Sequence, residues 1–163
     1  TQKLNDSTSG SAMAYFNLFA SVSEVEVERL RRDSSFVLSP SMVLGASHLI
    51  GYWVQAQPLG GLLGQALDGG QPLHLEFWHP LRAPVYHQRT AVAELARDIG
   101  DAWRLLLASH TPEEVEWLSF EVGRLLRVFQ HAAEAGECIV SALDSPSYPS
   151  KVRLPWLPSC DAS

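Results

Sequence analysis

The stretch TPEEVEWLSFEVGRLLRVFQHAAEAGECIVSALD, residues 111–144, carries the clearest structural pattern in the chain. Thr111 can cap a helix, Pro112 suits the first helical position, and two glutamates follow at the positive end of the helix dipole. Gly136 is expected to end this helix, and the apolar run ECIVSALD predicts a strand after it. Apolar residues recurring every three or four positions predict one buried helix face, formed by Val115, Leu118, Val122, Leu125, Phe129 and Ala132.

The start of the chain predicts a strand followed by a capped helix. MAYFNLFAS, residues 13–21, is aromatic and alternates between two sides, which is typical of a strand. Ser23 is a candidate N-cap, and Glu26 stands three residues later as its capping-box partner. We expect the helix to end near Asp33.

The middle of the chain predicts four further elements. Pro58 separates two short apolar runs, and Asp68, Gly69 and Gly70 close the second. Gly60 and Gly64, one helical turn apart, are expected to permit close helix packing. The expected elements are helices at 41–55 and 58–68, a strand at 73–78 and a helix at 90–110.

These elements predict one α+β domain with a small sheet flanked by several helices. The chain of 163 residues suits a single core. We expect this domain to span 13–144, after a leader at 1–12 that lies ahead of Met13. A Pro-rich C-terminal arm, 145–163, has no periodicity.

Composition narrows the classes of partner. The formal charge of −6 is negative, whereas binding a phosphate backbone requires positive charge, so we expect no nucleic acid ligand. The longest apolar-leaning run, 42–54, is too short to cross a bilayer, so we expect no membrane association. Cys138 lies in an apolar run and Cys160 in the arm, which suggests a buried thiol and a stray one and fits a reducing cytoplasm.

Histidines gather in the segment EFWHPLRAPVYHQRTAVAEL, residues 76–95, and just before it. His74, Glu76, His79 and His87 allow a His/carboxylate metal site to be imagined, but their spacing matches no metal motif. A small-ligand or metal-binding enzyme using these residues remains an alternative. The simpler interpretation is that Tyr86 packs while His87 and Arg89 project into water at a strand-to-helix junction.

Catalytic signatures are otherwise weak. The chain has no G-x-S-x-G elbow, and the segment PLGGLLGQALDGGQPL matches neither a dinucleotide nor a P-loop pattern. The glutamates of 113–121 mostly fall on the solvent-exposed side of an amphipathic helix, which argues against a pair of catalytic carboxylates. We therefore expect no enzyme activity and no cofactor.

Four stretches together resemble a known family. They are MAYFNLFASVSEVEVERL, PLGGLLGQALDGGQPL, PVYHQRTAVAELARDI and FEVGRLLRVFQHAAEAGECIVSAL, in that order. These stretches and their order resemble the YfbM-like family of uncharacterised bacterial proteins. The resemblance implies an α+β fold with a small sheet flanked by helices, and it implies no catalytic residue.

The leading functional hypothesis is a non-enzymatic bacterial protein-binding module. Its partner would be a protein, and an acidic surface would suit a basic toxin or effector, which makes an immunity protein, or antitoxin, the specific form of the hypothesis. Self-association into a homodimer through the arm remains open. The candidate partner-binding residues are His74, Glu76, Trp78, His79, Tyr86, His87, Arg89 and Trp156.

Overall fold

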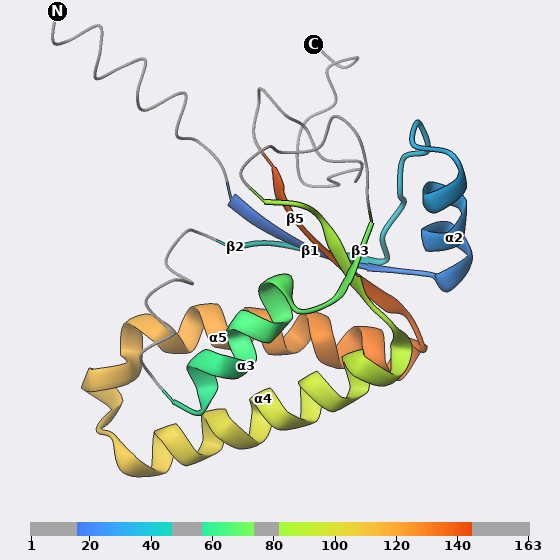
Figure 1. Ribbon diagram of the computed structural model, residues 1–163. Helices are drawn as coiled ribbons and strands as arrows, with labels where there is room; N and C mark the ends of the chain where they lie inside the picture. Colours follow the sequence, from blue (N-terminus) through green and yellow to red (C-terminus); the bar gives the residue numbers. More distant parts are fainter. Residues whose placement is uncertain (1–15, 47–56, 74–81, 145–163) are drawn as a thin grey trace, which may run out of the picture.

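A five-stranded antiparallel sheet forms the centre of the computed structural model, which describes residues 16–46, 57–73 and 82–144 (Figure 1). The strand order is β2-β1-β5-β4-β3. The central strands β1 and β5 pair along their whole length, from Phe16 with Asp144 to Val22 with Cys138. The strands are β1 (Phe16–Val22), β2 (Met42–Ala46), β3 (Gln71–Pro72), β4 (Val85–His87) and β5 (Cys138–Asp144).

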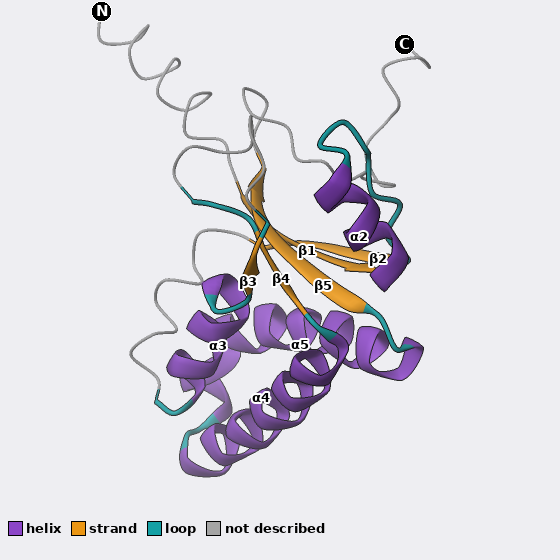
Figure 2. Cartoon of the chain, turned by 45° about the vertical axis from the view of Figure 1, so that its right-hand side comes forward, coloured by secondary structure: helices purple, strands orange, loops and turns teal. Residues whose placement is uncertain are grey.

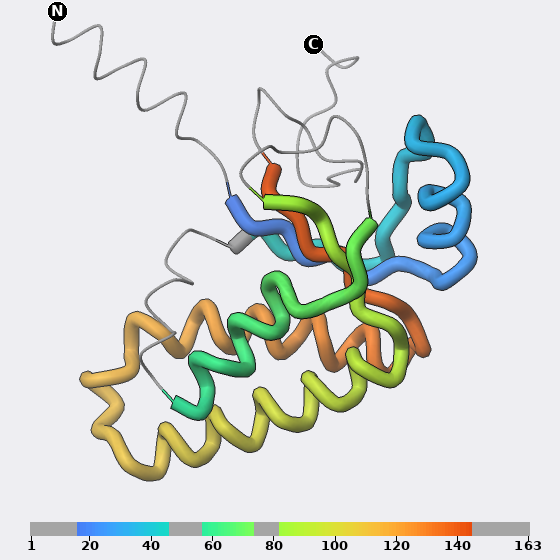
Figure 3. Tube along the Cα trace, viewed as in Figure 1, coloured from blue at the N-terminus to red at the C-terminus, as the bar shows by residue number. Residues whose placement is uncertain are grey.

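Helices cover both faces of this sheet (Figure 2). The short helix α2 lies on one face, whereas α3, α4 and α5 lie on the other. Helices α4 and α5 form an antiparallel hairpin, and the chain passes directly from β4 into α4 and from α5 into β5 (Figure 3). The helices are α2 (Glu24–Arg32), α3 (Leu59–Asp68), α4 (Arg89–Ser109) and α5 (Pro112–Ala135). The expected α+β fold with a small sheet flanked by helices is confirmed.

Alternation along the central strands produces two apolar cores. In β1, Leu18 and Ala20 pack toward α2, while Phe19 between them packs toward α3, α4 and α5. In β5, Val140 and Ile139 divide in the same way. Successive strand residues point to opposite faces, so a strand covered on both sides is largely apolar along its length.

The predicted N-caps Ser23 and Thr111 and the predicted helix end at Gly136 form, but the Glu26 carboxylate does not complete the capping box expected at α2, because it bonds elsewhere. The Ser23 side chain accepts a hydrogen bond from the Glu26 backbone at the start of α2, and Asp33 ends that helix. The Glu26 carboxylate accepts a hydrogen bond from the Ser39 backbone, 2.8 Å away. At α5, Thr111 and Glu114 form a full capping box. Gly136 ends α5 in the left-handed region, with φ of 68°.

The helix expected at 41–55 is wrong in its first part, because Met42–Ala46 form strand β2. These residues pair with β1 from Ser21 to Asn17, so tertiary hydrogen bonds at the sheet edge determine their conformation. The rest of that range, 47–56, lies outside the described residues. The strand expected at 73–78 also falls mostly outside them, since Leu73 follows β3 and 74–78 are not described.

Of the two glycines expected to permit close helix packing, Gly60 is buried in α3, whereas Gly64 has open space around it. A Cβ atom at Gly64 would meet nothing within 4 Å, so close helix packing does not require a glycine there. A Cβ atom at Gly70 would lie 2.5 Å from the backbone oxygen of Tyr86. The close approach is therefore between the chain leaving α3 and strand β4.

Candidate functional site

The junction between β4 and α4 directs three candidate residues to different environments. Tyr86 is buried on the α2 side of the sheet. His87, the next residue, lies on the opposite face and is only 2% exposed. Arg89 begins α4 and is largely exposed. The expected packing of Tyr86 and exposure of Arg89 are confirmed, but the expected projection of His87 into water is wrong.

His87 is buried because strand alternation turns it toward the face that α3, α4 and α5 cover. Its Nε2 donates a hydrogen bond to the Ala66 carbonyl oxygen, 2.8 Å away, and its ring lies 6.2 Å from that of Phe129. Burial lowers the pKa of His87, and the hydrogen bond to Ala66 partly opposes this shift. His87 therefore provides a hydrogen-bond donor for a carbonyl group in the last turn of α3.

Arg82 and Ser141 supply further hydrogen-bond donors to the same end of α3. The last carbonyl groups of a helix have no partners within it, and Gly69 at this end is not left-handed, with φ of −83°. Both Arg82 and the Ser141 hydroxyl donate to the Leu67 carbonyl oxygen, at 2.8 and 2.6 Å. Arg82 also donates to Asn17, at 3.1 Å. Burial lowers the pKa of Arg82 to about 10, which leaves it charged at neutral pH and suited to the negative end of the helix.

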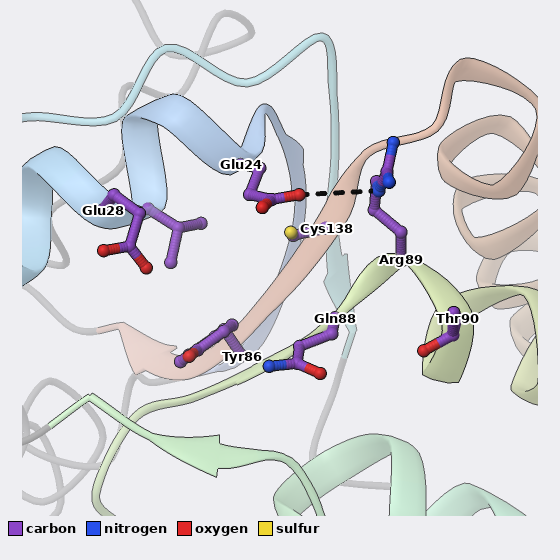
Figure 4. Close-up of a pocket in the computed structure, with 8 residues that line it drawn as sticks. Glu24, Glu28, Tyr86, Gln88, Arg89, Thr90 and Cys138 are labelled. Carbon is purple, nitrogen blue, oxygen red and sulfur yellow. Dashed lines mark ion pairs between the residues drawn. The ribbon is translucent and has the colours of Figure 1, made fainter.

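A groove opens on the other face of the sheet, between α2 and the start of α4 (Figure 4). We call it the α2–β4 groove. Its volume is about 250 Å³. The residues that line it include Glu24, Val27, Glu28, Tyr86, Arg89 and Cys138. It therefore contains two of the candidate partner-binding residues, Tyr86 and Arg89.

Each carboxylate in the α2–β4 groove has an arginine partner. Glu24 pairs with Arg89 at 3.5 Å, which links α2 to the start of α4, and the two side chains are 64% and 62% exposed (Figure 4). Glu28 pairs with Arg31 at 2.9 Å, and the Arg31 guanidinium lies 5.7 Å from the Tyr86 ring centroid. Exposed ion pairs contribute little to stability, so a partner can replace these contacts at low cost.

Cys138 lies in the same groove but is not reactive. Its side chain is buried, as the apolar run around it predicted. Burial, and then the nearby Glu24 carboxylate, raise the pKa of the Cys138 thiol to about 11. A thiol with this pKa stays protonated at neutral pH, whereas the thiolate is the nucleophile.

A polar network joins Ser21, Ser41, His131 and Glu137 at the end of the sheet where β5 begins. The Ser41 hydroxyl donates to Glu137 Oε1 at 2.5 Å and lies 2.8 Å from His131 Nε2. Ser21 also donates to Glu137 Oε1, at 2.7 Å. The sequence does not indicate this network, because its members are far apart in the chain and no short motif contains them.

The network differs from a hydrolytic triad in one decisive respect. In a triad, serine and carboxylate approach opposite nitrogens of the imidazole ring, so that the ring can carry a proton between them. Here the atom nearest to both Ser41 and Glu137 is Nε2, with Glu137 at 3.9 Å. The hydrogen bonds instead connect Ser41, before β2, and Ser21, near the end of β1, to the C-terminal end of α5.

The remaining candidates cannot be placed, because His74, Glu76, Trp78, His79 and Trp156 lie outside the described residues. Within the described ranges, no cluster of three His, Cys, Asp or Glu side chains could hold a metal ion. His87 uses its Nε2 for Ala66. In the part of the chain that the structure describes, no helix has the length and apolar character needed to cross a membrane.

Comparisons with protein-family models, curated proteins and solved structures returned no match to this chain. The resemblance to the YfbM-like family therefore rests on its quoted stretches alone and remains a prediction.

Proposed function

We propose that this protein is a non-enzymatic binding module that recognises another protein through the α2–β4 groove. The observation that carries the proposal is the exposed Arg89–Glu24 ion pair across a groove floored by buried Tyr86. Tyrosine and arginine are the residue types that most often dominate protein interfaces. The groove thus offers exchangeable charges above a largely buried tyrosine, which suit contact with a partner.

The chemistry of the groove supports binding in preference to catalysis. Its cysteine is held as a thiol, and its carboxylates pair with arginines on an open surface. A catalytic acid or base needs a pKa near the working pH and a position within reach of a bound reactant. Cys138, whose thiol pKa is raised to about 11, does not meet the first of these requirements.

The overall charge supports a basic partner. The chain carries −6, and electrostatic complementarity chiefly speeds encounter and sets specificity. An immunity protein that neutralises a basic toxic effector is the specific form of the proposal. In this form the protein would mask the effector by covering its functional surface.

Co-expression with the product of the neighbouring gene tests the proposal. We expect the two proteins to purify together at moderate salt, and we expect the neighbour to be toxic alone and harmless in the pair. The substitution Arg89→Glu should weaken the complex about tenfold, since it removes an interface arginine and repels Glu24. Titration calorimetry of the purified pair measures this change.

Arg97→Glu is the matched control, because Arg97 is an equally exposed arginine on α4 and lies outside the groove. It should leave the affinity within about twofold of the unsubstituted chain. A complex that tolerates both substitutions equally would remove the groove from the interface. Absence of both a complex and toxicity would reject the immunity function and favour ligand screening of the histidines at 74–79.

A further inference from the structure

Large apolar side chains are exposed at the tip of the α4–α5 hairpin. Leu107 is 43% exposed near the end of α4, and Trp117 and Phe120 are 52% and 66% exposed near the start of α5. This tip lies at the opposite end of the hairpin from α2 and the α2–β4 groove (Figure 3). Tryptophan and phenylalanine are enriched at the centres of protein interfaces.

A cleft of about 380 Å³, lined in part by Leu107, lies between the end of α4 and the first turns of α5. Leu107, Pro112 and Val115 form its apolar part, and Val115 belongs to the buried face of α5. Glu113 and Glu116 stand at its edge. The cleft can therefore take an apolar side chain with a charged group beside it.

Helix geometry makes the cleft and the aromatic residues one continuous surface. Glu113, Glu116, Trp117 and Phe120 are spaced by three, four and seven positions, so they follow one face of α5. We call these four residues together with Leu107 the hairpin surface. Arg124 bounds it, since its guanidinium lies 5.2 Å from the Phe120 ring centroid and 3.6 Å from Glu121.

The carboxylates of the hairpin surface differ from those of the α2–β4 groove in lacking cationic partners. Neither Glu113 nor Glu116 forms an ion pair within the described ranges. The neighbouring Glu114 is occupied by the backbone of Thr111 in the capping box. Two unpaired carboxylates beside an apolar cleft are complementary to a partner that brings its own positive charges.

We propose that the hairpin surface binds a segment of a partner protein in which apolar side chains are flanked by lysine or arginine. An apolar side chain fills the cleft beside Leu107, the partner's cations contact Glu113 and Glu116, and Trp117 with Phe120 supply contact area. The inference rests on the proposed protein-binding function and assigns it a second surface.

Nuclear magnetic resonance of the full isotope-labelled chain tests the inference with synthetic peptides. The probe is a helical peptide of leucine and lysine with an amphipathic pattern. One comparison peptide has glutamate for lysine, and another has serine for leucine. We expect only the probe to shift the backbone signals of Leu107 and 113–120 and the indole signal of Trp117.

Two double substitutions separate the two kinds of contact. Trp117→Ala with Phe120→Ala should weaken probe binding at least about tenfold, as loss of interface aromatic anchors does. Glu113→Gln with Glu116→Gln should weaken it about fivefold and make it less dependent on salt. Val25→Ala is the matched control, because Val25 is 74% exposed on α2, and it should leave binding unchanged.

Three results would overturn the inference: no probe binding at low salt, shifts confined to the α2–β4 groove, or equal binding of the peptide without leucine. Sedimentation would identify a second copy of the chain as the occupant if Trp117→Ala with Phe120→Ala abolished a dimer. The proposed function is judged separately, by co-purification and Arg89→Glu. If the two proteins co-purify but the probe does not bind the hairpin surface, this inference is rejected and the proposed function is not.

Discussion

Gly70 has no room for a side chain, because a Cβ atom there would lie 2.5 Å from the Tyr86 backbone oxygen and 3.2 Å from the His87 ring. Gly70→Ala should destabilise the protein by about 1–3 kcal/mol, the usual cost of forcing an extra group into a packed site. Urea unfolding measures the change. Gly64→Ala is the control, since its Cβ would meet nothing within 4 Å, and it should be neutral or stabilise helix α3 by up to about 1 kcal/mol.

His87 should make stability depend on pH. Its pKa in the folded protein is lowered from the ordinary 6.5, mainly by burial, so the unfolded state binds a proton at a higher pH than the folded state. Its contribution is therefore fully present above that ordinary value and is lost as pH falls toward the lowered folded pKa. We expect the free energy of unfolding to decrease between about pH 7 and about pH 5.

The substitution His87→Gln isolates this effect, because glutamine can donate to Ala66 but does not titrate in this range. Its unfolding free energy should fall less steeply over the same pH interval. His110→Gln, at an exposed histidine, should keep the steep decrease. Parallel slopes in all three proteins would mean that His87 is not the group responsible.

Single residues also show what sequence can and cannot predict. Ser23, Thr111 and Gly136 were predicted correctly because capping depends on near neighbours in the chain. His87 was not, because a three-residue strand has no visible alternation to say which face it turns to the core. The partner of His87 is a carbonyl in α3, twenty-one positions away. No local pattern indicates such a contact.

At the scale of elements, the capping box of α5 provides the next prediction. Thr111→Ala removes the side chain that accepts from the third residue of the helix, and it should cost about 1 kcal/mol of unfolding free energy. Chemical denaturation measures the loss. Thr90→Ala, in the first turn of α4, is the control and should leave stability unchanged or slightly raised, because alanine favours helix. Equal losses at both positions would contradict a capping role for Thr111.

Elements that depend on distant partners were predicted less well than helices with local signals. Helices α4 and α5 have long apolar stripes, so their sequence alone indicates them. Strand β2 is an edge strand whose hydrogen bonds come from β1, and its composition alone did not distinguish it from a helix. Strand β3 has only two residues, too few for any period to show.

At the scale of the whole molecule, the sequence predicted the α+β class but not the distribution of helices over the sheet. The uninterrupted burial of β5 indicates that both faces are covered. The structure shows that, among the helices of the described ranges, α2 covers one face and three helices cover the other. This asymmetry leaves the start of α4 beside α2 and so creates the α2–β4 groove. The groove is thus formed by elements that are distant in the sequence and adjacent in the fold. No short sequence motif can therefore indicate it.

A chain that ends at Asp144 lacks residues 145–163 but keeps every described helix and strand. Every described strand pairing and both apolar cores lie within 16–144, and β5 ends at Asp144. We therefore expect this shorter chain to keep its fold, with a melting temperature lowered by less than about 4 °C, equivalent to about 1 kcal/mol or less. Light scattering should show the same oligomeric state as for the full chain. A dimer that became a monomer on removal of 145–163 would instead identify those residues as an exchanged arm and favour the self-associating alternative over the binding module.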